Sequence, residues 1–382
     1  MKRVWIMVGL ACLLAGFPVR VLAAGPTVEA RSAVLMELST GTVLHEINAH
    51  EKLAPASVTK VMTMLLIMEA VDSGSISWQD RVTASAAAAA KGGSQVYLKE
   101  GETMTVEEML KSIAVSSAND CACAMAEHLA GSEEAFVERM NQKAAELGMT
   151  DTHFVNCTGL DDAPEAEAHR TSAYDIALMS RELMVKHPDI RRFTTVWMDT
   201  VRGGAFGLTN TNKMIRFYPG ATGLKTGFTS GAKYCLSATA EREGMELVAV
   251  VMGAESSKQR FDTCRQLLDY GFAGYAVVSP ELESGPAEVH VVLGKEETVS
   301  AKLGETMPIL VEKGQRAGVT VQAQLEPSVT APVSRGQRLG TLTVYSGDRV
   351  LAEIPLVAVR EVERMGWGDV FLQVLRKAAM AA

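Results

Sequence analysis

The pattern of apolar and polar positions predicts alternating strands and helices over the first part of the chain. Strand-like runs at 32–38 and 42–46 flank a turn at 39–41 and predict a β-hairpin. The apolar run 58–70 has the length of a helix, and Thr105-Val106-Glu107-Glu108 has the form of a capping box at a helix start. Runs 233–240 and 245–252 predict adjacent strands, and 256–271 predicts a helix that ends at Gly271. We therefore expect one domain of mixed helices and strands at 25–275.

The pattern changes after this domain. Residues 276–360 contain short alternating runs, such as 288–292 and 341–345, which are separated by glycine and proline. They contain no long run at helical spacing. Such a pattern is typical of a small β-sandwich or barrel-like domain, with 279–285 as a linker to it.

The last segment, 361–382, is apolar on one side at helical spacing. That side comprises Val362, Met365, Val370, Phe371, Val374, Leu375 and Ala378. Charged and amide side chains fall mostly on the opposite side. Together with Trp367, this pattern predicts an amphipathic helix that lies flat in a membrane interface. A helix that docks on its own domain is the alternative.

The first 24 residues have the pattern of a secretory signal peptide. Lys2 and Arg3 precede an almost entirely apolar run at 4–17, and small residues follow at Ala23 and Ala24. The run is shorter than the roughly 20 residues of a membrane span. A buried helix or an uncleaved anchor are the alternatives. We expect an exported protein, located at the outer face of the cytoplasmic membrane or in the cell wall space.

Composition excludes some classes of function. With 382 residues and 47% hydrophobic residues, the chain is long enough for two domains. The net charge is -8 and no basic block occurs, which argues against a nucleic-acid partner. The five cysteines beyond residue 24 are an odd number, and none has zinc-site spacing with histidine. We interpret them as small buried hydrophobes.

Ser57-Val58-Thr59-Lys60 is the first candidate for chemistry. On a helix, Ser57 and Lys60 lie one turn apart. Serine becomes a nucleophile when a base removes its proton, and a lysine with a lowered pKa is able to do so. The apolar residues that follow would keep Lys60 from water. Taken alone, the motif is more often a helix N-cap serine followed by an exposed lysine.

Two further short motifs follow in the same domain. Ser117-Ala118-Asn119 stands between two helical runs, where its hydroxyl and amide side chains could project from a turn. Lys225-Thr226-Gly227 follows a glycine-rich stretch, and its glycine would let an extended substrate approach an edge strand. Its lysine and threonine would attract a carboxylate. Each motif alone is also expected of an ordinary turn.

The three motifs together, in this order and after an export signal, are those of penicillin-binding proteins and class A β-lactamases. The chain resembles the low-molecular-mass penicillin-binding proteins that are D-alanyl-D-alanine carboxypeptidases, and the resemblance covers nearly its whole length. Further matching stretches are 93–98, 153–160, 169–175 and 331–340. The resemblance implies an α/β (α+β) transpeptidase-like domain with an antiparallel sheet flanked by helices. A small all-β domain and a terminal amphipathic helix would follow it.

The resemblance also implies roles for particular residues. Ser57 would form the acyl-enzyme, Lys60 would take its proton, and Ser117 and Asn119 would assist proton transfer and hold substrate. The residues that would line the substrate strand are Lys225, Thr226 and Gly227. Backbone N–H groups of Ser57 and Phe228 would form the oxyanion hole, and Arg260 would help to bind the terminal carboxylate. His153 and His169 are interpreted as structural residues.

The implied reaction removes the terminal D-alanine from peptidoglycan pentapeptide stems without a metal or organic cofactor. β-Lactams would acylate the same serine, and the membrane surface would be a partner of the C-terminal helix. A D,D-endopeptidase or weak transpeptidase with the same residues is the alternative, and the oligomeric state is left open. A class A β-lactamase is disfavoured, because Glu165 and Glu167 lack the expected E-x-x-x-N pattern. A non-catalytic wall-binding protein is disfavoured by the complete motif set.

Overall fold

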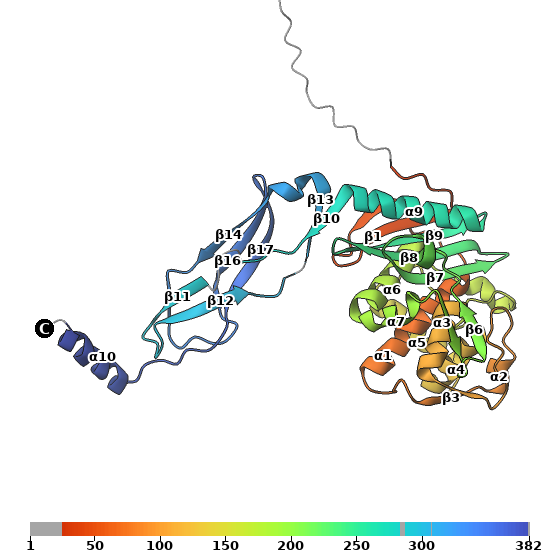
Figure 1. The fold of residues 1–382 in the computed structure, drawn as a ribbon, viewed down its shortest axis with the longest axis horizontal. Helices are drawn as coiled ribbons and strands as arrows, with labels where there is room; N and C mark the ends of the chain where they lie inside the picture. The colour runs from red at the N-terminus through yellow and green to blue at the C-terminus, as the bar shows by residue number, and fades with distance from the viewer. Residues whose placement is uncertain (1–24, 283–286, 307, 381–382) are drawn as a thin grey trace, which may run out of the picture.

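The computed structural model describes residues 25–282, 287–306 and 308–380 (Figure 1). The expected signal peptide at 1–24 lies outside the described residues. The strands of the N-terminal domain are β1 (Ser32–Glu37), β2 (Val43–Ile47), β3 (Arg81–Thr83), β4 (Thr103–Thr105), β5 (Met198–Val201), β6 (Phe206–Thr209), β7 (Ala221–Thr229), β8 (Lys233–Arg242) and β9 (Met245–Ala254). Five of them form an antiparallel sheet in the order β2-β1-β9-β8-β7.

Helices cover both faces of this sheet (Figure 1). They are η1 (Ala56–Thr59), α1 (Lys60–Asp72), α2 (Ala86–Ala89), α3 (Val106–Ser116), α4 (Asn119–Ala130), α5 (Glu133–Glu146), η2 (Pro164–Ala168), α6 (Ala173–Lys186), η3 (Pro188–Ile190), α7 (Arg191–Thr194), α8 (Met214–Phe217) and α9 (Ser257–Gly274). One apolar core lies between the sheet and α9, and a larger one lies between the other face and α1, α3, α4 and α6. The predicted sheet flanked by helices is confirmed.

Local sequence rules account for most element boundaries. The hairpin of β1 and β2 and the capping box at Thr105 form as expected. The helix predicted at 256–271 is different, because α9 continues to Gly274. A Cβ on Gly271 would lie 2.5 Å from Leu247 Cδ1, so this glycine permits close packing of the helix on the sheet. The expectation that it ends the helix was wrong.

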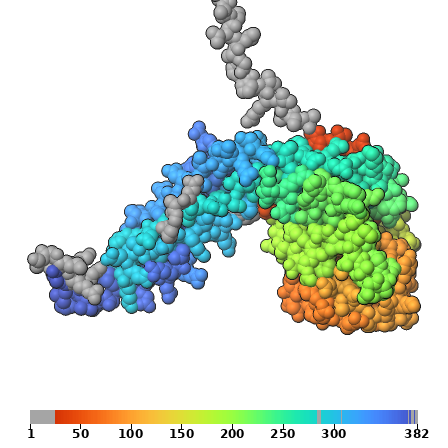
Figure 2. Space-filling model, in the orientation of Figure 1, coloured from red at the N-terminus to blue at the C-terminus, as the bar shows by residue number. Residues whose placement is uncertain are grey.

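The second region is built from strands, with the one short helix η4 (Lys313–Gly318) in its described part. The strands are β10 (Tyr275–Val278), β11 (Ala287–Val292), β12 (Thr298–Leu303), β13 (Ile309–Glu312), β14 (Val319–Leu325), β15 (Ser328–Thr330), β16 (Arg338–Ser346) and β17 (Arg349–Ala358). Six of them form the sheet β14-β16-β17-β12-β11-β15, and β10 pairs with β13. We call this region, 275–364, the β-rich domain. Figure 2 shows it as an arm beside the rounded N-terminal domain.

The terminal helix α10 (Trp367–Met380) lies at the end of the β-rich domain that is remote from the N-terminal domain (Figure 1). Trp367 is 94% exposed, and Phe371, Leu372, Val374 and Leu375 are also exposed. No helix in the described part of the chain has the length and apolar character that crossing a membrane requires.

Candidate active site

Ser57 and Lys60 meet at the junction of η1 and α1. The Lys60 Nζ atom lies 2.9 Å from Ser57 Oγ, which is the one-turn contact expected from their spacing. Ser57 is half-buried, whereas the Lys60 side chain is fully buried. The apolar residues of α1, including Val61, Met64 and Leu65, surround this end of the helix with core. The hydroxyl therefore faces an amine that is withdrawn from bulk water.

Burial lowers the pKa of Lys60 from its ordinary value to about 7, against the opposing effects of Cys157 and Asp120. An amine with this pKa is partly neutral near neutral pH. A neutral Lys60 carries a lone pair that is able to accept the Ser57 proton across the 2.9 Å contact. Lys60 Nζ also donates a hydrogen bond to the Thr158 carbonyl, at 2.7 Å. The two contacts fix the amine in the position that a general base would occupy.

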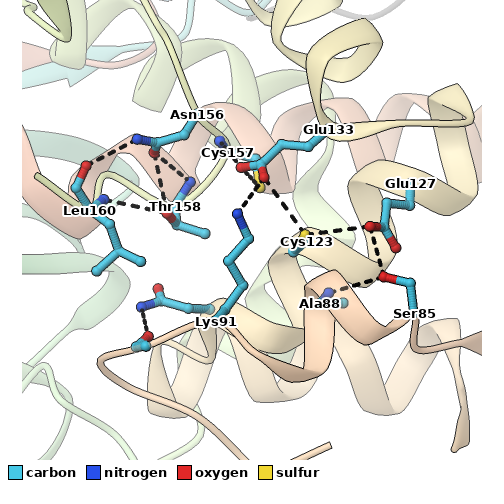
Figure 3. A network of polar contacts seen from close by, with 12 residues as sticks. Ser85, Ala88, Lys91, Cys123, Glu127, Glu133, Asn156, Cys157, Thr158 and Leu160 are labelled. Carbon is cyan, nitrogen blue, oxygen red and sulfur yellow. Dashed lines mark hydrogen bonds and ion pairs between the residues drawn. The ribbon is translucent and has the colours of Figure 1, made fainter. Parts of the chain in front are cut away.

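The loop that carries Thr158 is held by the network in Figure 3. Asn156 Oδ1 accepts hydrogen bonds from the N–H groups of Thr158, at 3.1 Å, and Gly159, at 2.6 Å. The Cys157 N–H donates to Glu133 on α5, and Glu133 pairs with Lys91. The backbone next to the Thr158 carbonyl is thus held by α5 as well as by its own loop.

Ser117 and Asn119 lie at the break between α3 and α4. Ser117 has a left-handed backbone, with a φ of 64°, and is 4% exposed. The Asn119 Nδ2 atom donates to the Gly92 carbonyl at 2.7 Å, and the Asn119 N–H donates to the Ser94 carbonyl. Among the described residues, the buried Asn119 Oδ1 has no hydrogen-bond partner. It remains able to accept a hydrogen bond from a bound group.

Lys225, Thr226 and Gly227 lie within β7, the edge strand, and not in a turn before it. Lys225 is fully buried and donates to the Thr226 carbonyl at 2.9 Å. Burial, together with the positive charges of Lys60 and Arg260, lowers the pKa of Lys225 well below its ordinary value. A bound anion would be favoured here, because an opposite charge stabilises the charged forms of Lys225, Lys60 and Arg260.

Gly227 is required for a reason that sequence alone did not indicate. A Cβ at this position would lie 2.7 Å from the Pro55 carbonyl oxygen and 3.1 Å from the Ser57 nitrogen. The edge strand therefore passes directly against the turn that carries the nucleophile. From the sequence, this glycine was expected to let a substrate approach the strand. In the structure, the protein's own backbone occupies the space beside it.

Phe228 and Arg260 lie beside this strand. The Phe228 side chain is 53% exposed and packs on Tyr234, so the residue presents its ring to solvent. Arg260, which is 7% exposed, donates to the Gly227 carbonyl at 3.0 Å and to the Cys235 carbonyl at 3.2 Å. The structure thus brings Arg260 to the back of the predicted substrate strand.

Sequence reasoning missed two residues at this site. Thr158 supplies a carbonyl to Lys60, and the buried Asp120 carboxylate accepts from the N–H groups of Val96 and Leu98. Thr158 lies in the family-like stretch 153–160, but the role of each residue depends on a contact that is distant in sequence. Glu165 and Glu167 are exposed on η2. Within the described part of the chain, no three histidine, cysteine, aspartate or glutamate side chains are arranged to hold a metal ion.

Family models match both regions of the chain. A family model described as D-alanyl-D-alanine carboxypeptidase matches residues 20–256, and a model of the penicillin-binding protein 5 C-terminal domain matches residues 282–364. The chain is 45% identical over 345 residues to D-alanyl-D-alanine carboxypeptidase DacF of Bacillus subtilis, covering 89% of this chain and 87% of that protein.

Solved structures show the same similarity. Penicillin-binding protein 5 from Haemophilus influenzae has a TM-score of 0.72 and 28% identity, and the match covers 89% of this chain and 99% of that one. Penicillin-binding protein D2 from Listeria monocytogenes, in its ampicillin-bound form, has a TM-score of 0.59 and 32% identity. That match covers 64% of this chain and 98% of the other.

Proposed function

This chain belongs to the D-alanyl-D-alanine carboxypeptidase family, and we propose that it removes the terminal D-alanine from peptidoglycan pentapeptide stems through an acyl-enzyme on Ser57. The resemblance inferred from the motifs is confirmed at the level of the family. The observation that carries the residue-level proposal is the 2.9 Å contact between Ser57 Oγ and a buried Lys60 whose pKa is about 7.

Acylation begins with proton transfer from Ser57 to neutral Lys60. The serine oxygen attacks the carbonyl of the D-Ala–D-Ala bond, and the negative charge that develops on that carbonyl oxygen is stabilised by the N–H groups of Ser57 and Phe228. The close approach of Gly227 to the Ser57 nitrogen supports this oxyanion hole, because it brings β7 beside the serine backbone.

The leaving D-alanine must gain a proton when its C–N bond breaks. Lys60 returns the proton that it took from Ser57, and Ser117 lies at the α3–α4 break as a relay to the leaving nitrogen. Water then attacks the ester and its proton passes to Lys60, and Lys60 gives that proton to Ser57 Oγ as the ester C–O bond breaks. Lys225 and Thr226 lie in β7 and Arg260 lies behind it, where we expect them to bind the terminal carboxylate.

The same nucleophile accounts for β-lactam binding, which the ampicillin-bound relative supports. Opening of the lactam ring leaves an ester on Ser57 and no departing fragment that would make room for water. The proposal therefore predicts a long-lived adduct with penicillins.

Incubation of the purified protein with a pentapeptide ending in D-Ala–D-Ala tests the reaction. Free D-alanine without a cross-linked product is the expected result, and Ser57→Ala is expected to release none. Cleavage of peptide cross-bridges without D-alanine release would instead indicate an endopeptidase, and a cross-linked product would indicate a transpeptidase.

The location of the protein is a second part of the proposal. We infer that the chain is exported and that α10 attaches it to the outer face of the cytoplasmic membrane. The exposed Trp367, Phe371 and Val374 support this, since such side chains lower their free energy in a membrane interface. Deletion of 363–382 is expected to move the protein from the membrane fraction to the soluble fraction. An unchanged distribution would contradict the anchor.

A further inference from the structure

We propose that His169 is a positioning residue for the nucleophile, because its imidazole holds the turn that presents Ser57. The inference rests on the proposed acyl-enzyme function, to which it adds a residue outside the three motifs. His169 follows η2 and lies 110 positions beyond Thr59 in the chain, yet its Nε2 atom is 2.8 Å from Thr59 Oγ1. Thr59 is the third residue of the Ser57–Lys60 motif.

The hydrogen bonds determine which imidazole nitrogen carries the proton. The Val155 N–H donates to His169 Nδ1 at 3.1 Å, so Nδ1 must be unprotonated. The proton of the neutral ring is therefore on Nε2, which donates to Thr59 Oγ1. The Thr59 hydroxyl in turn donates to the Ala56 carbonyl at 2.8 Å. A directed chain of three hydrogen bonds thus runs from the Val155 backbone to the residue before Ser57.

These hydrogen bonds end at the turn before Ser57, whose backbone conformation requires stabilisation. Ala56 has a φ of 49°, in the left-handed region that residues with a Cβ seldom adopt. Its carbonyl is also pressed against Gly159, where an added Cβ would lie 1.8 Å from the Ala56 oxygen. The hydrogen bond from Thr59 satisfies that carbonyl and fixes its direction. The direction of the Ser57 backbone and side chain follows from it.

The surroundings of His169 keep the ring neutral. The side chain is 3% exposed and its ring meets Phe154 edge-on. Burial, together with the positive charges of His153, Arg170 and Lys60, lowers the pKa of His169 to about 4. A doubly protonated ring would donate from both nitrogens and lose the Val155 contact. The neutral donor–acceptor form is therefore the one present over the range in which Lys60 works.

Substitutions can separate this role from general support of the fold. His169→Gln keeps one acceptor and one donor, whereas His169→Leu keeps neither. Thr59→Val removes the hydroxyl at nearly constant volume. His187→Leu is a matched control, since His187 is also a buried histidine but pairs with Asp72 at the far end of α1.

The experiment measures acylation by a fluorescent penicillin in the full chain, with the first-order acylation step separated from the initial binding constant. We expect His169→Leu and Thr59→Val to slow the acylation step by about tenfold to a hundredfold, as for other misplaced nucleophiles, with little change in initial binding. The double variant should acylate no more slowly than either single variant, because both substitutions interrupt the same series of hydrogen bonds. His169→Gln should restore most of the rate, and His187→Leu should lose thermal stability without losing rate.

Three results would overturn the positioning role while wild-type protein still reacts: a wild-type rate in His169→Leu, an equal loss of rate in His187→Leu at matched stability, or a His169→Gln variant as slow as His169→Leu. Wild-type protein that forms no adduct would instead remove the proposed function, and this role with it.

Discussion

The two domains differ most in what they bury. The N-terminal domain buries Lys60, Asp120, His169, Lys225 and Arg260, whereas the described part of the chain beyond residue 274 contains no buried polar or charged side chain. The core of the β-rich domain consists of apolar residues such as Val299 and Leu342. Burying a charge costs several kcal/mol unless it is compensated. The difference indicates that the N-terminal domain buries polar groups for a chemical reaction. The β-rich domain is stabilised by apolar packing.

Lys60→Met tests most strongly whether the buried amine of the N-terminal domain serves catalysis. Methionine fills the buried site without an amine. We expect acylation by penicillin to fall by about 10²- to 10⁴-fold, the range for loss of a general base. The melting temperature should change little, because the lost bond to Thr158 is offset by removal of a buried amine. Rate and melting temperature are measured on the same preparation. Wild-type acylation by this variant would refute Lys60 as the base.

A substitution in the β-rich domain should have the opposite effect. Leu342 is 1% exposed in the core of that domain, and Leu342→Ala is expected to destabilise it by about 2–5 kcal/mol. The acylation rate of the folded protein should remain that of the wild type. Denaturant unfolding measures the loss of stability, and reaction with penicillin measures the acylation rate. A large loss of rate in protein that remains folded would show that the domains are coupled.

The buried His169 should make the stability of the N-terminal domain depend on pH. Its pKa, about 4 when folded, lies below the ordinary histidine value. Between pH 6.5 and 4 the unfolded chain binds a proton that the folded chain does not, so stability falls as the pH drops through this window. The total is about 3 kcal/mol for this group.

His169→Gln cannot titrate, and its free energy of unfolding should depend less steeply on pH over the same range. Urea unfolding of the two proteins between pH 6.5 and 4 provides the comparison. Parallel pH curves would contradict the low pKa of His169.

Gly227→Ala is expected to destabilise the N-terminal domain by less than Leu342→Ala destabilises the β-rich domain. The added methyl group would meet the Pro55 carbonyl at 2.7 Å, which corresponds to overpacking of about 1–3 kcal/mol. Acylation should slow as well, since the displaced backbone carries Ser57. Gly314→Ala is the matched control in the β-rich domain, because nothing lies within 4 Å of its Cβ position. Thermal melting of both variants measures the difference, and equal shifts would argue against the close approach.

The sequence predicted the elements and motifs that depend on local rules. Ser57 and Lys60 meet because their spacing is one helical turn, and the cysteines in the described residues are free and buried, as interpreted. Thr158 and Asp120 could not be predicted, because their contacts with the site join segments that are distant in the chain.

Glycines show the same limit. Gly271 was expected to end α9 and Gly227 to admit a substrate, since in sequence a glycine indicates only freedom or space. In the structure both permit close packing, against Leu247 and against the Pro55 carbonyl respectively. Tertiary contacts determine which neighbour fills the space beside a glycine. His169 was likewise interpreted as structural, and its contact with Thr59 is seen only in the folded chain.

Intact-protein mass spectrometry after incubation with benzylpenicillin, followed by peptide mapping, tests whether Ser57 is the nucleophile. We expect a mass increase of one penicillin per chain, located on Ser57 and absent from Ser57→Ala. No adduct on the folded wild-type protein, or an adduct that persists in Ser57→Ala, would contradict it.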